Sequence, residues 1–151
     1  MKKSITFLCA AGLATAAFGA GSDGTVTFNG TAPFGGFNGG GEFDVSSIAG
    51  PRLFGNFQTF CIELNENLSP GTDYTFDVNT AAVNGGIGGG NPDPLDAKTA
   101  ALYEAFANGT LANYDFDNDG DGGQSGNLDR RNSAAALQAA IWEIEEERTI
   151  E

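Results

Sequence analysis

Cys61 and Gln138, which lie far apart in this chain, are residues whose types can do covalent chemistry together. Cys61 belongs to the run FCIE at positions 60–63 and is the only cysteine left once a predicted signal peptide is removed. A lone thiol in an exported protein has no disulfide partner, so it is buried, reactive or linked to something other than cysteine. A glutamine side chain, such as that of Gln138 in the run LQAAIWEI at positions 137–144, can be that partner.

Residues 1–20 have the features of a Sec-type signal peptide. Lys2 and Lys3 form a short basic start, an apolar stretch rich in alanine covers positions 5–18, and small residues follow, which places the cleavage after Gly19 or Ala20. Cleavage removes the other cysteine, Cys9. No later run approaches the roughly 20 apolar residues needed to cross a bilayer. We therefore expect an exported protein, extracellular or at the cell surface, without a membrane span in this chain.

Residues 21–151 are enough for a single domain with one modest core. Loss of the two leading lysines leaves five basic residues against 20 acidic ones, a net charge of −15. So acidic a chain lacks the basic face that nucleic-acid binding requires, and its charge favours solubility outside the cell and affinity for cations.

The chain contains no histidine. This excludes nucleophilic sites of the Cys-His and Ser-His-Asp types and the usual catalytic zinc sites. No pair of carboxylates of the kind that hydrolyses glycosides stands out against the acidic background. We therefore expect that the protein is not an enzyme.

The first half of the chain has the alternating pattern of β-strands. Short alternating stretches cover residues 24–28 and 41–45, a stronger one covers 53–64, and another covers 72–78, with glycine clusters as loops between strands. The last two strands are predicted to form a hairpin with a loose loop. Because side chains alternate along a strand, Cys61 is expected to point away from the apolar face that carries its two neighbours.

The second half has the signals of helices. Asp93 is the predicted N-cap of a first helix that ends before Gly109, and a second helix is expected to start at Asn132 or Ser133 and to continue through Arg148. The second helix ends in a run of acidic residues that opposes the helix dipole, so we expect the natural domain to continue beyond it. The predicted fold class is α+β, with an antiparallel β-rich N-terminal half, a barrel or sandwich, and a helical C-terminal half.

Gln138 lies beside the apolar stripe of this second helix, among alanines that leave it sterically open. Its side chain can therefore face the packing surface. Together, the cysteine run and the Gln-x-x-Ile-Trp run resemble the paired motifs of bacterial thioester domains found on surface adhesins. Similar motifs occur in exported proteins that carry a PEP-CTERM sorting signal. The resemblance covers roughly residues 43–147 and is moderately specific as a pair.

The resemblance implies that Cys61 is the thiol and Gln138 the acyl donor of an internal thioester. A thiolate attacks the carboxamide carbon, ammonia leaves, and an electrophilic acyl-sulfur bond remains. A lysine amine or a hydroxyl on another surface then attacks the carbonyl, once per molecule. Because water competes, the bond needs an apolar shield. The candidates for this shield are Phe57, Phe60, Tyr103 and Trp142.

A purely structural interpretation of the same residues, without covalent chemistry, stays open. A single free cysteine usually behaves as a small, buried apolar side chain. Trp142 fits a core position under either interpretation, and Glu63 is expected to be a solvated strand residue. In this alternative the protein is a non-covalent extracellular matrix or surface protein.

A second motif consists of acidic residues at alternate positions followed by glycine, in the run DFDNDGDG at positions 115–122. This pattern resembles the start of a calcium loop, in which hard oxygen ligands converge and glycine permits a sharp turn. A flexible acidic loop would have the same composition. No cofactor is required for the predicted chemistry, and Ca²⁺ would stiffen the connection into the second helix. The candidate ligands are Asp115, Asp117, Asp119, Asp121 and Asp129.

These observations favour an exported surface or adhesin domain that attaches covalently, in a single use, to amine or hydroxyl groups on an extracellular protein or polysaccharide. Neither nucleic acid nor a membrane is an expected partner. The alternative is the non-covalent structural protein, stabilised by calcium, in which Cys61 is simply buried.

Overall fold

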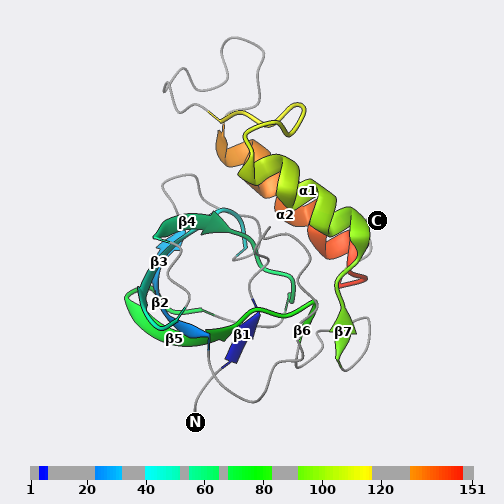
Figure 1. Ribbon diagram of the computed structural model, residues 1–151. Coiled ribbons are helices and arrows are strands. Elements are labelled where there is room, and N and C mark those ends of the chain that lie inside the picture. Colours follow the sequence, from blue (N-terminus) through cyan, green and yellow to red (C-terminus); the bar gives the residue numbers. More distant parts are fainter. Residues whose placement is uncertain are drawn as a thin grey trace.

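The computed structural model describes residues 4–6, 23–31, 40–51, 55–64, 68–82, 92–116 and 130–147. These residues form an α+β fold in which a curved sheet lies beside a pair of helices (Figure 1). The strands come first in the chain and the two helices last. The elements are β1 (Ser4–Thr6), β2 (Gly24–Thr31), β3 (Phe43–Ala49), β4 (Asn56–Thr59), β5 (Thr72–Asp77), β6 (Ala81–Ala82), β7 (Asp93–Pro94), α1 (Ala97–Ala107) and α2 (Arg130–Ile144).

The main sheet has the strand order β1-β5-β2-β3-β4. β2 is antiparallel to both β5 and β3, and β3 is antiparallel to β4, whereas β1 pairs in parallel with β5. Alternate residues of these strands point to one face and bury it, as the two-residue period of a strand requires. This sheet cluster consists of Val26, Phe28, Phe43, Val45, Tyr74 and Phe76.

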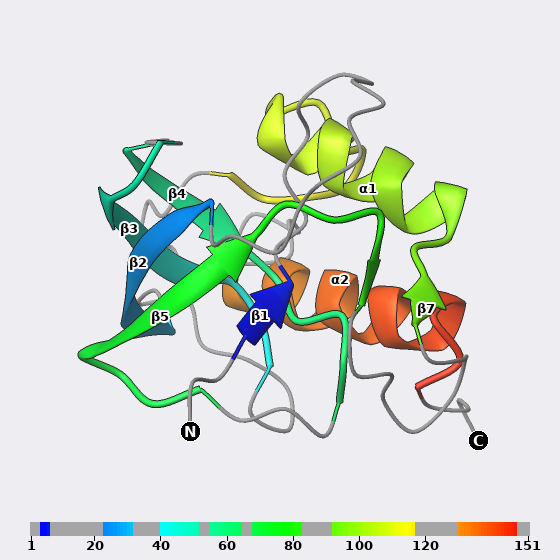
Figure 2. The ribbon, with the colours of Figure 1, turned by 60° about the horizontal axis from the view of Figure 1, so that its bottom comes forward.

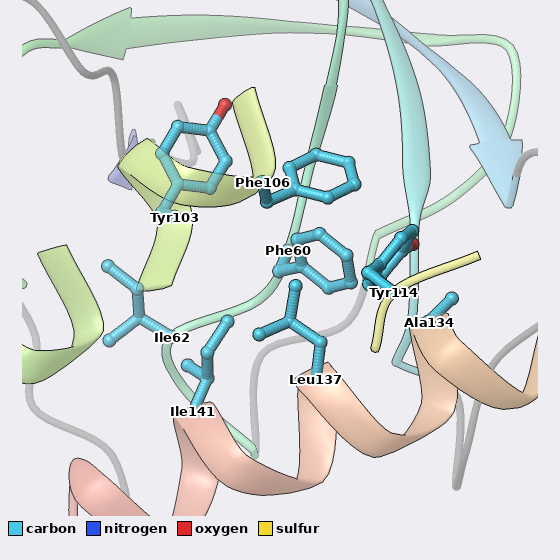
Figure 3. Close-up of a cluster of buried hydrophobic side chains, with 8 residues drawn as sticks. All are labelled: Phe60, Ile62, Tyr103, Phe106, Tyr114, Ala134, Leu137 and Ile141. Carbon is cyan, nitrogen blue, oxygen red and sulfur yellow. The ribbon is translucent and has the colours of Figure 1, made fainter. Parts of the chain in front are cut away.

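The two helices lie side by side next to the curved sheet, as the two ribbon views show (Figures 1 and 2). Their facing sides form a second cluster together with the segment that follows β4 (Figure 3). Phe106 of α1 stands at its centre and packs edge-on against the rings of Phe60 and Tyr114. The buried members of this helix cluster are Phe60, Ile62, Tyr103, Phe106, Tyr114, Ala134, Leu137 and Ile141.

Both helices end in the same hydrogen-bonded turn, the Schellman motif. At the end of α1, Thr110 N–H donates to the carbonyl of Ala105, and Gly109 has a φ of 67°. At the end of α2, Glu147 N–H donates to the carbonyl of Trp142, and Glu146 has a φ of 60°. A left-handed backbone suits glycine, so Glu146 adopts this conformation at a cost.

The α+β class is confirmed, but the predicted pairing of the strands is wrong. β4 pairs with β3, and β5 pairs with β2, so the strands near 53–64 and 72–78 do not form a hairpin. The 53–64 strand is also shorter than expected, because regular pairing stops at Thr59. Within the described residues the sheet does not close into a barrel, since β1 and β4 stand at its two edges.

The predicted helix limits need correction at both helices. Asp93 and Pro94 form β7, and Asp96 is the N-cap of α1, where its carboxylate accepts the N–H of Lys98. α2 starts at Arg130, two or three residues earlier than expected, and it ends at Ile144 and not at the expected Arg148, because the turn at Glu146 closes it. The described part of the predicted signal peptide, β1, lies at the edge of the sheet.

Candidate functional site

Gln138 is completely buried on α2, with an exposed fraction of 0%. Its neighbours on the same side of the helix, Ala134, Ile141 and Trp142, are buried as well. This arises from the helical period, which aligns residues three and four positions apart. A polar side chain removed from water in this way requires hydrogen-bond partners within the protein.

The carboxamide of Gln138 finds these partners in the backbone around Cys61. Its Oε1 accepts two backbone N–H groups, from Cys61 and from Gly41, each at 3.0 Å. Its Nε2 donates to the carbonyl oxygen of Cys61 at 2.7 Å. The amide is thus hydrogen-bonded to both ends of the cysteine residue, whose Cα carries the thiol side chain between them.

This arrangement has a chemical consequence for the carboxamide carbon of Gln138. Two N–H donors on one carbonyl oxygen withdraw electron density and favour a negative charge on that oxygen. An attack on the carbonyl carbon produces such a charge. The site therefore has the donors of an oxyanion hole, directed at the side chain that sequence reasoning selected as acyl donor.

Hydrogen bonds at three points hold the segment that carries Cys61 against the helices. Tyr103 Oη donates to the carbonyl of Gln58 at 2.9 Å, before the cysteine. Gln138 binds the cysteine itself. Leu64 N–H donates to the Glu147 carboxylate at 3.0 Å, after the cysteine. Cys61 is partly buried and packs on the sheet cluster, whereas its neighbour Phe60 belongs to the helix cluster, as the predicted alternation required.

Gly40 and Gly41 complete the site and were missed as site residues by the sequence analysis. A Cβ on Gly40 would lie 2.5 Å from Cη2 of Trp142 and 2.7 Å from Cγ of Gln138, so a larger residue does not fit there. Gly41 has a φ of 129°, which only glycine adopts readily, and in this conformation it donates its N–H to the glutamine. The glycine cluster at 39–41 was the available signal, but it indicated only a loop.

Glu42, the residue after Gly41, has a fully buried carboxylate that is held by charged and polar partners. Arg130 binds it in a bidentate way, with Nε on Oε2 at 3.0 Å and Nη2 on Oε1 at 2.6 Å. Tyr114 Oη donates to the same Oε2 at 2.9 Å. Arg130 Nη1 also donates to the carbonyl of Phe116 at 2.6 Å. We call Glu42, Arg130 and Tyr114 the glutamate clamp.

The pKa values of Tyr114 and Arg130 are both raised in the clamp. Burial, and then the nearby charge of Glu42, raise the pKa of Tyr114 far above its ordinary value, so the phenol stays protonated and donates. The hydrogen bond to Glu42 raises the pKa of Arg130 further, against the opposing effect of burial. The guanidinium and the phenol are therefore fixed as donors to Glu42 over the physiological pH range.

The four predicted shielding residues do not gather at one place. Trp142 is 2% exposed, and its ring lies with the Gln138 side chain around Gly40. Phe60 and Tyr103 are buried in the helix cluster (Figure 3). Phe57 is partly buried against the sheet cluster.

The predicted calcium ligands lie mostly outside the described residues. Asp117, Asp119, Asp121 and Asp129 fall in the part of the chain that the structure leaves undescribed. Asp115 is described, and its backbone N–H is bound by Ser133 Oγ at 3.1 Å. Within the described ranges, no group of three or more potential metal-ligating side chains comes together.

Acidic side chains near the end of α2 are more buried than the sequence suggested. Glu63, expected in solvent, is only 5% exposed. Glu147 is 2% exposed and accepts the N–H of Leu64. Glu145 is 5% exposed and accepts the N–H of Asp96, and burial raises its pKa above the ordinary 4.5. The acidic end that opposes the helix dipole thus supplies acceptors to backbone donors of neighbouring segments.

No protein-family model, curated protein or solved structure matches the chain. Over the ranges that the structure describes, neither helix is long and apolar enough to span a membrane.

Proposed function

We propose that this chain is an exported surface or adhesin domain that forms an internal thioester between Cys61 and Gln138 and uses it once for covalent attachment. The observation that carries the proposal is the buried carboxamide of Gln138, hydrogen-bonded to both the N–H and the carbonyl of Cys61. Two residues separated by 77 positions are thereby held in direct contact. The proposed electrophile, the Gln138 carboxamide carbon, and the proposed nucleophile, the Cys61 thiol, belong to residues in contact, as an intramolecular reaction requires.

The proposed reaction has two steps. In the first, the Cys61 sulfur bonds to the Gln138 carboxamide carbon, the carbon-nitrogen bond breaks, and the nitrogen leaves as ammonia after taking the thiol proton. In the second, an external amine or hydroxyl attacks the same carbon, the carbon-sulfur bond breaks, and Cys61 recovers a proton as a free thiol. The product is an amide or ester that links Gln138 to the partner.

The proposed partner is an extracellular protein or polysaccharide that bears amines or hydroxyls. Attachment through a bond needs only one reactive group on the target, so the acidic surface does not have to form an extended complementary interface. Neither a metal nor a cofactor takes part in the two steps.

Intact-mass measurement tests the proposal. The mature protein should weigh less than its sequence by one ammonia, and methylamine should add to Gln138 and release one alkylatable thiol. Cys61→Ser and Gln138→Ala should each restore the full mass, and Gln58→Ala, which changes a glutamine away from the bond, should keep the deficit. A wild-type protein with full mass and an alkylatable Cys61 would sink the covalent function.

A second candidate function is favoured by the same hydrogen bonds. As an intact amide, Gln138 satisfies two backbone donors and one acceptor, which is enough reason for a buried structural glutamine. The protein would then be a non-covalent extracellular structural protein, with calcium bound by the acidic run at 115–122. Full mass, together with a thermal midpoint that rises on adding Ca²⁺ and falls on chelation, would favour this candidate.

A further inference from the structure

We infer that the glutamate clamp positions the Gly41 N–H as an oxyanion donor to Gln138, and so sets the rates at which the thioester forms and reacts. This inference rests on the proposed function. The donating groups on the reacting carbonyl are the backbone N–H groups of Gly41 and Cys61. Glu42, Arg130 and Tyr114 touch no reacting atom and act as positioning residues.

The need for positioning follows from the backbone at Gly41. Glycine has more conformational freedom than any other residue, so a glycine N–H is a poorly fixed donor by itself. The donor must nevertheless point at Oε1 when negative charge develops there. Gly41 itself is buried, but burial alone does not set the direction of its N–H.

The clamp supplies this direction through the next residue in the chain. The Glu42 side chain is 0% exposed and receives three hydrogen bonds, two from Arg130 and one from Tyr114. Bidentate pairing with a guanidinium fixes both carboxylate oxygens and therefore the plane of the group. Because Glu42 is held so firmly, the peptide group between Gly41 and Glu42 cannot rotate freely. This peptide group is next to the one that carries the donor N–H of Gly41.

The clamp also joins the donor to the element that carries the acceptor. Arg130 is the first residue of α2, and Gln138 lies two turns further along the same helix. Any shift of α2 thus moves the clamp and the glutamine together. Gly41, which lies just before β3, and the Gln138 carboxamide therefore keep their relative position, because one helix holds both.

In both chemical steps the charge on Oε1 appears and disappears without a change in the clamp. When a nucleophile attacks, the carbonyl π electrons move to Oε1, where the two N–H groups stabilise them. When sulfur or nitrogen leaves, the electrons return. The clamp itself exchanges no proton, since Tyr114 remains protonated and Arg130 remains charged.

Kinetics on three variants test the inference. Glu42→Gln keeps the size of the side chain and weakens the charged pair, and Tyr114→Phe removes only one hydroxyl. Each should slow methylamine addition and ammonia loss, by about tenfold for Glu42→Gln, below the hundredfold or more typical of losing an oxyanion donor outright. Glu145→Gln is the matched control, because it neutralises a buried carboxylate of the α2 end that binds Asp96 instead.

Hydrogen exchange gives a readout that a purely structural role would not move. In Glu42→Gln the amide of Gly41 should exchange faster, while the amide of Leu64, bound to Glu147, should keep its protection. The thermal midpoint of the variant should equal that of the wild type. A Glu42→Gln protein with wild-type rates and wild-type Gly41 protection would overturn the inference alone. A wild-type protein of full mass would overturn the proposed function and the oxyanion role with it, which the mass measurement shows before any variant is made.

Discussion

Gln138 spans the backbone of Cys61, accepting its N–H through Oε1 and donating to its carbonyl through Nε2. Because these bonds involve the cysteine backbone and not its sulfur, the covalent and the packing roles of the pair can be separated. One variant can remove the nucleophile without the hydrogen bonds, and another can disturb the hydrogen bonds.

Cys61→Ser should abolish the ammonia deficit and the reaction with methylamine, yet keep all three hydrogen bonds to Gln138. Gln138→Glu should abolish the chemistry too, but it would place a carboxylate oxygen against the carbonyl of Cys61, where Nε2 now donates. We expect Gln138→Glu to be less stable than Cys61→Ser by about 1 to 3 kcal/mol, the cost of a buried polar group that loses its partner. Urea unfolding of the two variants measures the difference, and equal stabilities would contradict the packing role.

Gly40→Ala should disturb the site through size alone. The new methyl group would lie within 3 Å of Gln138 Cγ and of the Trp142 ring, so the glutamine must move. We expect a loss of about 1 to 3 kcal/mol in the free energy of unfolding, as for other overpacked sites, and a smaller ammonia deficit by intact mass. Gly55→Ala is the control, because a Cβ there meets no atom within 4 Å, although its φ of 73° adds strain. An unchanged deficit in Gly40→Ala would show that the contact does not position the glutamine.

The sequence predicted the two central residues of this site but not the groups that surround them. The helical period placed Gln138 on the packing side, and the alternation of the sequence separated Cys61 from Phe60, although both residues lie just after the end of β4. The roles of Gly41 and Glu42 could not be predicted, since they depend on a contact between the segment before β3 and α2. Glu42 and Arg130, for example, are 88 residues apart in the sequence. The same limit explains the wrong hairpin, as strand partners are chosen by long-range packing and not by the alternation of each strand.

Glu63 is the clearest failure of a local argument. A glutamate that alternates with apolar residues is normally expected in solvent, yet Glu63 is buried in the segment that follows β4. Helix limits failed for a related reason. Asp93 and Asp96 are both good N-caps, and only the pairing of β7 with β6 decides between them.

Glu146→Gly should stabilise the protein. Glu146 is exposed and holds a left-handed backbone at the end of α2, where glycine avoids the steric penalty of a Cβ. We expect a gain of up to about 1 kcal/mol, measurable as a higher thermal midpoint. Gly109→Glu, the reverse change in the equivalent turn of α1, should lower the midpoint. A neutral or destabilising Glu146→Gly would mean that its side chain makes a contact worth more than the strain.

Glu145 should make stability depend on pH. Burial raises its pKa above 4.5 in the folded protein, so the unfolded chain loses this proton first as the pH rises. Its contribution to stability is full below about pH 4.5 and is lost as the pH rises through the raised pKa. Glu145→Gln should therefore gain stability relative to wild type from pH 4 to pH 7. Glu143→Gln, on the exposed side of α2, should show no such trend, and parallel curves for all three proteins would contradict the prediction.

The 77 positions between Cys61 and Gln138 give the proposed bond a thermodynamic consequence. A covalent link over that distance would close a large loop in the unfolded chain and remove about 4.5 kcal/mol of its conformational entropy, as a disulfide of equal span does. Attack by a partner opens this loop. On this proposal, a domain that has captured its target would be more easily unfolded than a domain that still holds its thioester, and it would be the better substrate for proteases.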